Sequence, residues 1–222
     1  MVRDDDEDAE GGAQGSWWEL VLLFGGGSLA LFVGRHAVAG IFFPGLWLVA
    51  GLVWWHLRRD RTFDGKRLWR WEGRGWWRNE IGIPLGIGVP LLVGGLALFA
   101  PERLFDLPRE RTGLWLAILL LYPLFSVIPQ ELVFRAFLHH RYRSILSDRG
   151  LRILVSAIAF GLAHAFFGNW EAPLLSTLGG LLFARTYERT TSIWPVAIEH
   201  AIWGDVIMTI GLGSSFYAGN VV

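Results

Sequence analysis

The chain has 222 residues, of which 53% are hydrophobic, and its 20 basic residues balance its 20 acidic ones. Such a composition lies well to the apolar side of soluble domains, and zero net charge gives no indication of a nucleic-acid partner. The absence of cysteine excludes disulfides, thiol catalysis and cysteine-ligated zinc. Residues 1–15 are strongly acidic, which predicts disorder and does not fit the basic start of a secretory signal peptide.

Two apolar runs follow, 17–33 and 37–57, each close to the roughly 20 residues that span the hydrocarbon of a bilayer. Ser16 and Glu19 have the spacing of a capping box, which predicts a helix start there. Tryptophans lie at the ends of these runs, as aromatic belts do: Trp17, Trp18, Trp54 and Trp55. The pattern predicts two membrane-spanning helices.

The longest polar stretch, 58–79, interleaves eight arginines and lysines with four tryptophans. One interpretation is a nucleic-acid patch with stacking aromatic side chains. We favour the other, a cytoplasmic loop that lies on anionic lipid headgroups, because arginine supplies charge there and tryptophan prefers the interface.

Further apolar runs cover 81–100, 113–128, 153–167, 172–186 and 192–212. The pair Gly82 and Gly86 in the first of them suits close helix packing. The stretch 113–145 would be about 50 Å long as one helix, so it kinks at Pro129, protrudes, or divides into two segments. His139 and His140, next to Arg141, are interpreted as interfacial charge.

These runs predict an all-α, polytopic bundle of about seven spans, or eight if 113–145 divides. With a cytoplasmic N-terminus, the arginine-rich stretches 58–79, 139–152 and 185–189 all fall inside, as the positive-inside rule requires. The chain then divides into N-terminal spans (16–112), a C-terminal core (113–213) and a short tail (214–222).

Polar side chains interrupt the C-terminal spans. Glu131 and Arg135 are four residues apart and share one helix face, and a carboxylate in a membrane marks a partner or a functional site. His164 and His200 lie in two later apolar runs. If 130–146 and 151–167 form a hairpin, Gln130 and His164 reach the same depth, and Phe134 and Phe160 fall on one seam: a Glu/His/His cluster is geometrically allowed.

Such a cluster supports water activation. A desolvated carboxylate can act as a general base, while histidine can share the water, pass its proton or donate to an oxyanion. Arg135 would hold Glu131 in place. The set suits peptide-bond hydrolysis without a cofactor, and Glu131, His164 and His200 would also form a zinc set.

The motifs Gln130-Glu131-x-x-Phe134-Arg135 and Phe160-x-x-x-His164, followed by His200, resemble the CPBP intramembrane proteases. This is the family of the type II CAAX prenyl endopeptidase and of bacterial relatives linked to bacteriocin self-immunity, and the resemblance covers about 114–213. It implies a helical protein of the bacterial inner membrane that cleaves peptide bonds with a glutamate-activated water and no compulsory metal.

The resemblance also implies roles for single residues. The first acidic position would activate water with His164, the second would act with Arg135 in orientation, and His200 with an asparagine four residues on would stabilise the oxyanion. This chain has Gln130 at the first acidic position and Gly204 at the asparagine position. We therefore expect Glu131 to take over the base role, with Gln130 positioning water or substrate.

Four further residues are candidate accessory groups: Glu199, Asp205, Phe134 and Phe160. Glu199 and Asp205 could equally be structural partners of arginines such as Arg185. The expected partners are membrane lipids and a membrane-associated protein or peptide substrate, with no nucleic acid. Two alternatives stay open beside the endopeptidase: an inactive relative acting as a membrane binding or immunity protein, and a small proton-coupled transporter.

Overall fold

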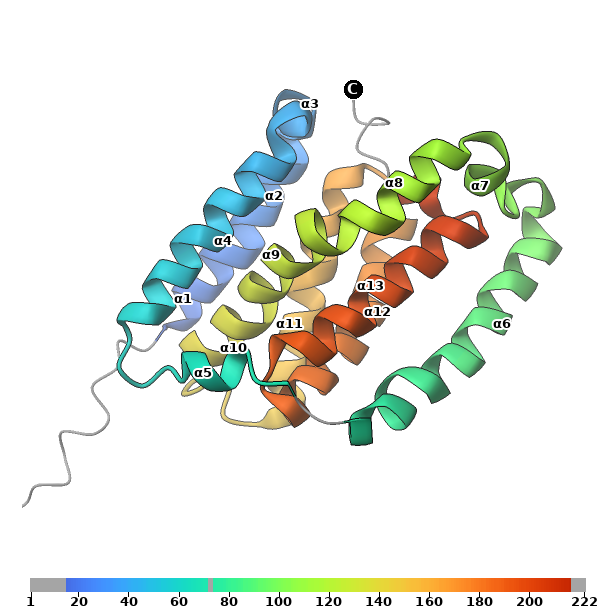
Figure 1. Ribbon diagram of the computed structural model, residues 1–222. Helices are drawn as coiled ribbons and strands as arrows, with labels where there is room; N and C mark the ends of the chain where they lie inside the picture. Colours follow the sequence, from blue (N-terminus) through green and yellow to red (C-terminus); the bar gives the residue numbers. More distant parts are fainter. Residues whose placement is uncertain (1–14, 72–73, 217–222) are drawn as a thin grey trace, which may run out of the picture.

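The computed structural model describes residues 15–71 and 74–216, so most of the acidic start and of the tail lies outside the described residues. Within the described residues the chain is helical and contains no strand, which confirms the predicted all-α class (Figure 1). The main helices are α1 (Trp17–Leu20), α2 (Gly27–Val33), α3 (Arg35–Val38), α4 (Phe42–Arg59), α5 (Gly65–Leu68), α6 (Ile83–Phe99), α7 (Asp106–Glu110), α8 (Thr112–Tyr122), α9 (Ile128–Glu131), α10 (Leu138–Arg141), α11 (Arg149–His164), α12 (Glu171–Thr190) and α13 (Ile193–Ile210).

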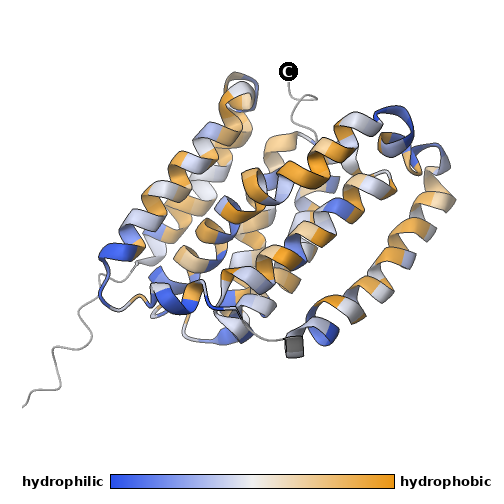
Figure 2. Cartoon of the chain, in the orientation of Figure 1, coloured by the Kyte–Doolittle hydropathy of each residue, from blue (hydrophilic) through white to orange (hydrophobic). Residues whose placement is uncertain are grey.

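Five helical segments are long and apolar enough to cross a membrane: Arg35–Arg59, Arg78–Phe99, Thr112–Arg141, Arg149–Phe167 and Ile193–Ile210. A shorter apolar helix covers Trp17–Val33. The remaining predicted run corresponds to α12, which is 20 residues long but more polar. Figure 2 shows hydrophobic colour along the helices and hydrophilic colour at the two ends of the bundle. The structure therefore supports a helical membrane bundle.

The segment Thr112–Arg141 is one continuous helical run, which answers the question raised by its length. It contains two π-helical turns, Pro123–Val127 and Leu132–Phe137. A π turn widens the helix by one residue and is often found at functional sites. The run is not divided, so the prediction of an eighth span is not needed.

The predicted hairpin between this run and α11 is present. Asp148 caps α11 by accepting the backbone N–H of Leu151 at 2.7 Å, and Ser156 Oγ donates to the Phe134 carbonyl oxygen at 2.8 Å. The rings of Phe134 and Phe160 meet edge to face with centroids 5.3 Å apart. This contact confirms the predicted seam and fixes the depth of one helix of the hairpin against the other.

The helices differ greatly in how much of them is buried inside the protein. The buried share of the apolar window is 6% in Arg35–Arg59 and 11% in Arg78–Phe99, but 33% in Arg149–Phe167 and 50% in Ile193–Ile210. A Cβ added at Gly86 or Gly94 would have no other group within 4 Å. The close packing that the glycines of the third run suggested is therefore absent at these two positions.

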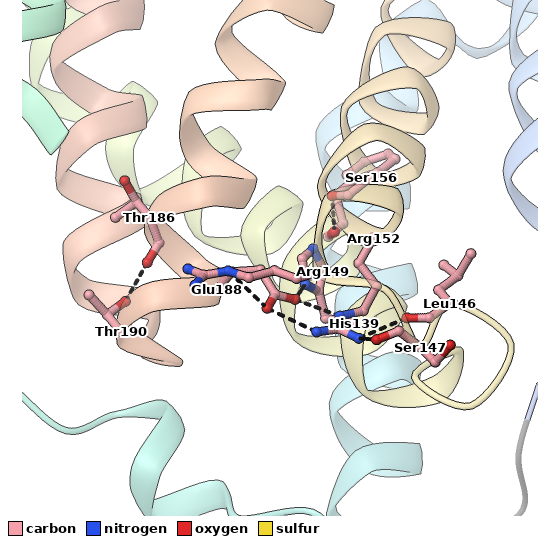
Figure 3. Close-up of polar contacts among 10 residues, drawn as sticks. His139, Leu146, Ser147, Arg149, Arg152, Ser156, Thr186, Glu188 and Thr190 are labelled. Atoms are coloured by element: carbon pink, nitrogen blue, oxygen red, sulfur yellow. Dashed lines mark hydrogen bonds and ion pairs between the residues drawn. The ribbon is translucent and has the colours of Figure 1, made fainter.

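Ion pairs join the helices at the end of the bundle that carries α5 and α10 (Figure 3). Glu188 accepts from His139 at 2.7 Å and from Arg152 at 2.7 Å, with Arg149 at 3.8 Å. The pair His140–Asp60, at 2.9 Å, ties α10 to the end of α4. The two histidines interpreted as interfacial charge thus lie at this polar end of the bundle, where each imidazole is bound to a carboxylate of a neighbouring segment.

Three further ion pairs lie at this end. Arg141 binds Glu19 at 2.9 Å, and Arg185 and Arg189 both bind Glu80. The suggestion that Arg185 pairs with Glu199 or Asp205 is wrong, since Glu80 supplies the partner. The start of the third run is thus anchored to the end of α12 by charge.

Candidate active site

A buried charged cluster lies where the long helical run meets α13. Glu131 is completely buried, and its Oε1 lies 2.6 Å from His200 Nδ1. Its second oxygen, Oε2, lies 3.3 Å from Nε of Arg135, which is also completely buried. The structure thus brings together a carboxylate, a guanidinium and an imidazole that are 4 and 69 residues apart in the sequence.

A cavity of about 1540 Å³ lies beside this cluster and is lined mainly by apolar side chains from α2, α4, the long run and α11 to α13. Gln130, His164 and His200 are part of its wall, whereas Glu131 and Arg135 are not. Successive residues of a helix point about 100° apart, and here Gln130 faces the cavity while Glu131 turns away from it. Glu131 therefore reaches the cavity through its bond to His200.

The protons on the two histidines follow from their partners. His164 Nδ1 lies 2.8 Å from the Phe160 carbonyl oxygen, which can only accept, so Nδ1 carries the proton and Nε2 holds a lone pair. His200 Nδ1 lies against the Glu131 carboxylate that Arg135 also contacts, so the same reasoning puts a proton on Nδ1 of His200 and a lone pair on its Nε2. Two imidazoles with basic Nε2 atoms therefore belong to one cavity.

Aromatic rings hold the imidazoles in place. Phe160 lies 4.4 Å from the His164 ring and 5.3 Å from the His200 ring, measured between centroids. Phe183 stacks on His200 at 4.5 Å with an interplanar angle of 19°. The Arg135 guanidinium lies 4.7 Å above the centre of Phe160, a cation–π distance. Phe160, chosen from the sequence as an accessory residue, contacts all three polar groups, while Phe183 was missed because it has no motif.

Gln130 contributes an amide to the same wall. Its Nε2 donates to Ser126 Oγ at 2.7 Å, and its Oε1 has no hydrogen-bond partner in the part of the chain that the structure describes. A serine hydroxyl both donates and accepts, so the amide keeps a partner whichever way it is turned. Gln130 can thus offer either an N–H group or an oxygen to a bound molecule. Phe134 lines the cavity as well.

Gly204 shows how the chain fills the position where the resemblance expects an asparagine. A Cβ at Gly204 would collide with the ring and the hydroxyl of Tyr122. Tyr122 and Gly204 both line the cavity, and the Tyr122 ring lies 5.9 Å from that of His200. A tyrosine hydroxyl therefore occupies space beside His200 that a side chain at 204 would need. Sequence reasoning missed Tyr122, although its place in an apolar run next to Pro123 was a signal.

The other two accessory candidates are not brought to the cavity wall. Glu199 is completely buried and neither of its oxygens has a hydrogen-bond partner among the described residues. Oδ1 of Asp205 is also buried and has no hydrogen-bond partner among the described residues. Neither residue lines the cavity, so contact with a bound substrate does not involve them.

The alternative zinc set does not fit this arrangement. In residues 15–71 and 74–216 no group of three histidine or carboxylate side chains is placed to hold a metal ion. Both histidines line the cavity, whereas the Glu131 carboxylate lies outside its wall, so the three groups of the set do not face one common space.

Residues 112–204 match the profile of the family described as type II CAAX prenyl endopeptidase Rce1-like. The matched segment contains the long helical run, α11, α12 and the first two thirds of α13, and with them each residue of the charged cluster. Searches of curated proteins and of solved structures found no match to the chain.

Proposed function

Residues 112–204 are similar to the Rce1-like family, and on that premise we propose that the chain is an intramembrane endopeptidase. The family supports a CAAX-type protease in general terms. The finer proposal is that a water activated by histidine hydrolyses a peptide bond of a membrane-associated protein or peptide inside the cavity.

The bond between Glu131 and His200 carries the proposal. A buried carboxylate bound to Nδ1 of a histidine fixes the tautomer and stabilises the imidazolium that forms when Nε2 takes up a proton. Arg135 pairs with Glu131 and orients its carboxylate. Glu131 thus enters the reaction by positioning His200, instead of touching water as the sequence suggested. His164, neutral and held by the Phe160 carbonyl group, positions the water through its own Nε2.

The first step transfers one proton and forms one bond. Nε2 of His200 takes a proton from the water as the water oxygen bonds to the carbonyl carbon, and the carbonyl oxygen becomes an oxyanion. In the second step the C–N bond breaks, and the imidazolium of His200 returns its proton to the departing amine. The products are a carboxylic acid and an amine, and both histidines end neutral.

The developing oxyanion needs hydrogen-bond donors aimed into the cavity. Tyr122 supplies a hydroxyl beside His200, and Gln130 supplies an amide N–H group. This pair takes the place of the asparagine that Gly204 cannot provide. In this proposal Gln130, which lies in the motif, and Tyr122, two helical turns before it, together compensate for the missing asparagine side chain at Gly204.

One observation favours a second candidate, a non-cleaving relative that binds a membrane partner or gives immunity. Gln130 cannot act as a base, and Gly204 has no side chain. The cavity would then bind an apolar segment without hydrolysing it. The two candidates differ only in whether a peptide product is released.

We place the protein in a bacterial inner membrane with its N-terminus in the cytoplasm. The arginine-rich segments 58–79, 139–152 and 185–189 belong to the end of the bundle that carries α5 and α10 in Figure 1, while the connections at the opposite end hold the sparser Arg35, Arg103, Arg109 and Arg111. Cytoplasmic loops carry such an excess of arginine and lysine.

The test is cleavage of a membrane-peptide library by the purified protein in detergent, with product masses read by mass spectrometry. Replacing a single oxyanion donor costs about 10²–10³ in rate, so Tyr122→Phe should lower kcat by that order. Tyr187→Phe is the matched control, since it removes a buried hydroxyl that does not line the cavity. His200→Ala and His164→Ala should abolish cleavage.

EDTA should have no effect on the rate. Full activity of His200→Ala would overturn the proposed mechanism. A wild type that releases no product from any library member, but retains a partner on crosslinking, would favour the non-cleaving relative. Equal losses in Tyr122→Phe and Tyr187→Phe would remove Tyr122 from the oxyanion site.

A further inference from the structure

A second, smaller groove of about 570 Å³ lies on the outside of the bundle, between the helical segment Arg78–Phe99 and α12. One wall comes from Asn79, Ile83 and Ile87, and the other from Leu182, Arg185 and Arg189. Trp203 of α13 closes its base. In Figure 1, α6 stands at the edge of the bundle, away from α2 and α4. The groove is therefore accessible from the lipid.

Both walls change from polar to apolar in the same direction. On the first wall Asn79, Ile83 and Ile87 follow one another at helical spacing, with the polar residue at the basic end of the bundle. On α12, which runs the opposite way, Leu182 lies deepest and Arg185 and Arg189 lie one and two turns nearer the basic end. A lipid has this same profile: a charged head at the membrane surface and chains below it.

The charge at the head end is positive. Arg185 and Arg189 are 44% and 47% exposed and share a single carboxylate, that of Glu80, which is almost completely buried. Two guanidinium groups against one carboxylate leave one net positive charge on the rim of an otherwise apolar groove. Guanidinium groups present several N–H donors in a planar fork, which suits phosphate oxygens.

We propose that this groove is a binding site for an anionic phospholipid, with its phosphate at Arg185 and Arg189 and its chains along Ile83, Ile87 and Leu182. Basic pockets between membrane helices at the cytoplasmic side are suited to such headgroups. This groove opens on another side of the bundle from the cavity, although Gly88, Leu182 and Trp203 line both spaces, and lipid binding there does not depend on whether the protein cleaves anything.

Trp203 links the groove to the candidate active site. Its indole lines both spaces and packs so closely on Gly88 that a Cβ there would lie 2.5 Å from the ring. His200 is three residues before Trp203 on the same helix. A lipid chain in the groove therefore contacts the tryptophan that forms part of the wall of the cavity.

The test is native mass spectrometry of the protein released from nanodiscs of equimolar phosphatidylglycerol and phosphatidylcholine with identical chains. One net charge near the headgroups should give a preference for phosphatidylglycerol of roughly fivefold. The double variant Arg185→Gln/Arg189→Gln should lose the preference. The matched control is Arg58→Gln/Arg59→Gln, which removes two charges from the same end, where the guanidinium groups lie over Trp54 and Trp55; it should retain the preference.

Glu80→Gln gives the sharpest result, because it should strengthen the preference, again roughly fivefold, by removing the carboxylate that Arg185 and Arg189 share. A misfolded variant cannot produce this gain. An unchanged or weaker preference in Glu80→Gln would overturn the proposal, as would equal losses in the two arginine double variants. Free glycerol phosphate should not displace the lipid, and displacement by it would reduce the groove to a simple anion site.

Discussion

The N-terminal helices, residues 17–99, and the C-terminal helices, residues 112–210, differ in where their charged side chains lie relative to the membrane and to the protein interior. In the N-terminal part, the charged residues lie at helix ends and the helix faces are apolar and exposed. In the C-terminal part, Glu131, Arg135 and His200 lie in the interior and bind one another. The least hydrophobic of the membrane segments, Ile193–Ile210 with mean hydropathy 1.2, is also the most buried.

Exposed apolar faces and buried polar groups follow from the lipid that surrounds the helices. Lipid is as apolar as leucine, so apolar area gives no reason to pack inward, and buried positions go to small residues and to polar groups that need one another. The C-terminal helices are therefore held by specific contacts and can support a site. The N-terminal helices supply walls for the cavity and face lipid elsewhere.

The largest expected effect comes from comparing two broken Glu–Arg pairs, one inside the C-terminal part and one that joins the N-terminal part to it. Glu131→Ala leaves the buried Arg135 guanidinium without its carboxylate, and such a loss costs about 3–5 kcal/mol of unfolding free energy. The Glu19 side chain is 31% exposed, so Glu19→Ala, which breaks the pair with Arg141, should cost less than about 1 kcal/mol. Thermal or SDS-induced unfolding in detergent measures both.

The double variant Glu131→Leu/Arg135→Met should recover much of the lost stability, because both charges leave together. If Glu19→Ala destabilised the protein as much as Glu131→Ala, the contrast between the two regions would fail.

The sequence predicted those features of the two regions that depend on local periodicity, and it did not predict those that depend on how the helices pack. The apolar runs predicted the helices, and the motif spacing predicted the Phe134–Phe160 seam, because both depend on local periodicity. That Glu131 turns away from the cavity while Gln130 faces it was not predictable, since the face that turns to the cavity depends on how the helices pack. Tyr122 and Phe183 have no motif and become visible only when the walls of the cavity are assembled.

A smaller effect is expected from adding the same side chain to a glycine in each region. At Gly180 a Cβ would lie 2.9 Å from Ala157 Cα, so Gly180→Leu forces α11 and α12 apart and should cost about 1–3 kcal/mol. At Gly94 a Cβ has no other group within 4 Å, so Gly94→Leu only extends into lipid and should be neutral or stabilising, as glycine is a poor helix former. Unfolding in detergent compares the two. A destabilising Gly94→Leu would mean that α6 packs against a partner on that face.

The smallest effect concerns the junction between the two regions, the pair of Asp60 at the end of α4 and His140 of α10. Burial raises the pKa of Asp60, but hydrogen bonds from Thr62 and His140 outweigh it and lower that pKa to about 2. A lowered folded-state pKa stabilises the fold above the unfolded-state value of 3.8, and this contribution is lost as the pH falls toward 2. Wild type should therefore exceed Asp60→Asn in unfolding temperature at pH 6, by an amount that corresponds to less than about 1 kcal/mol. The difference should shrink below pH 4, because protonation then removes the charge that the substitution removes. A difference that stays constant from pH 6 to pH 3 would show that the Asp60 side chain acts by its shape and hydrogen bonds alone, and that charge does not join the lipid-facing helices to the core.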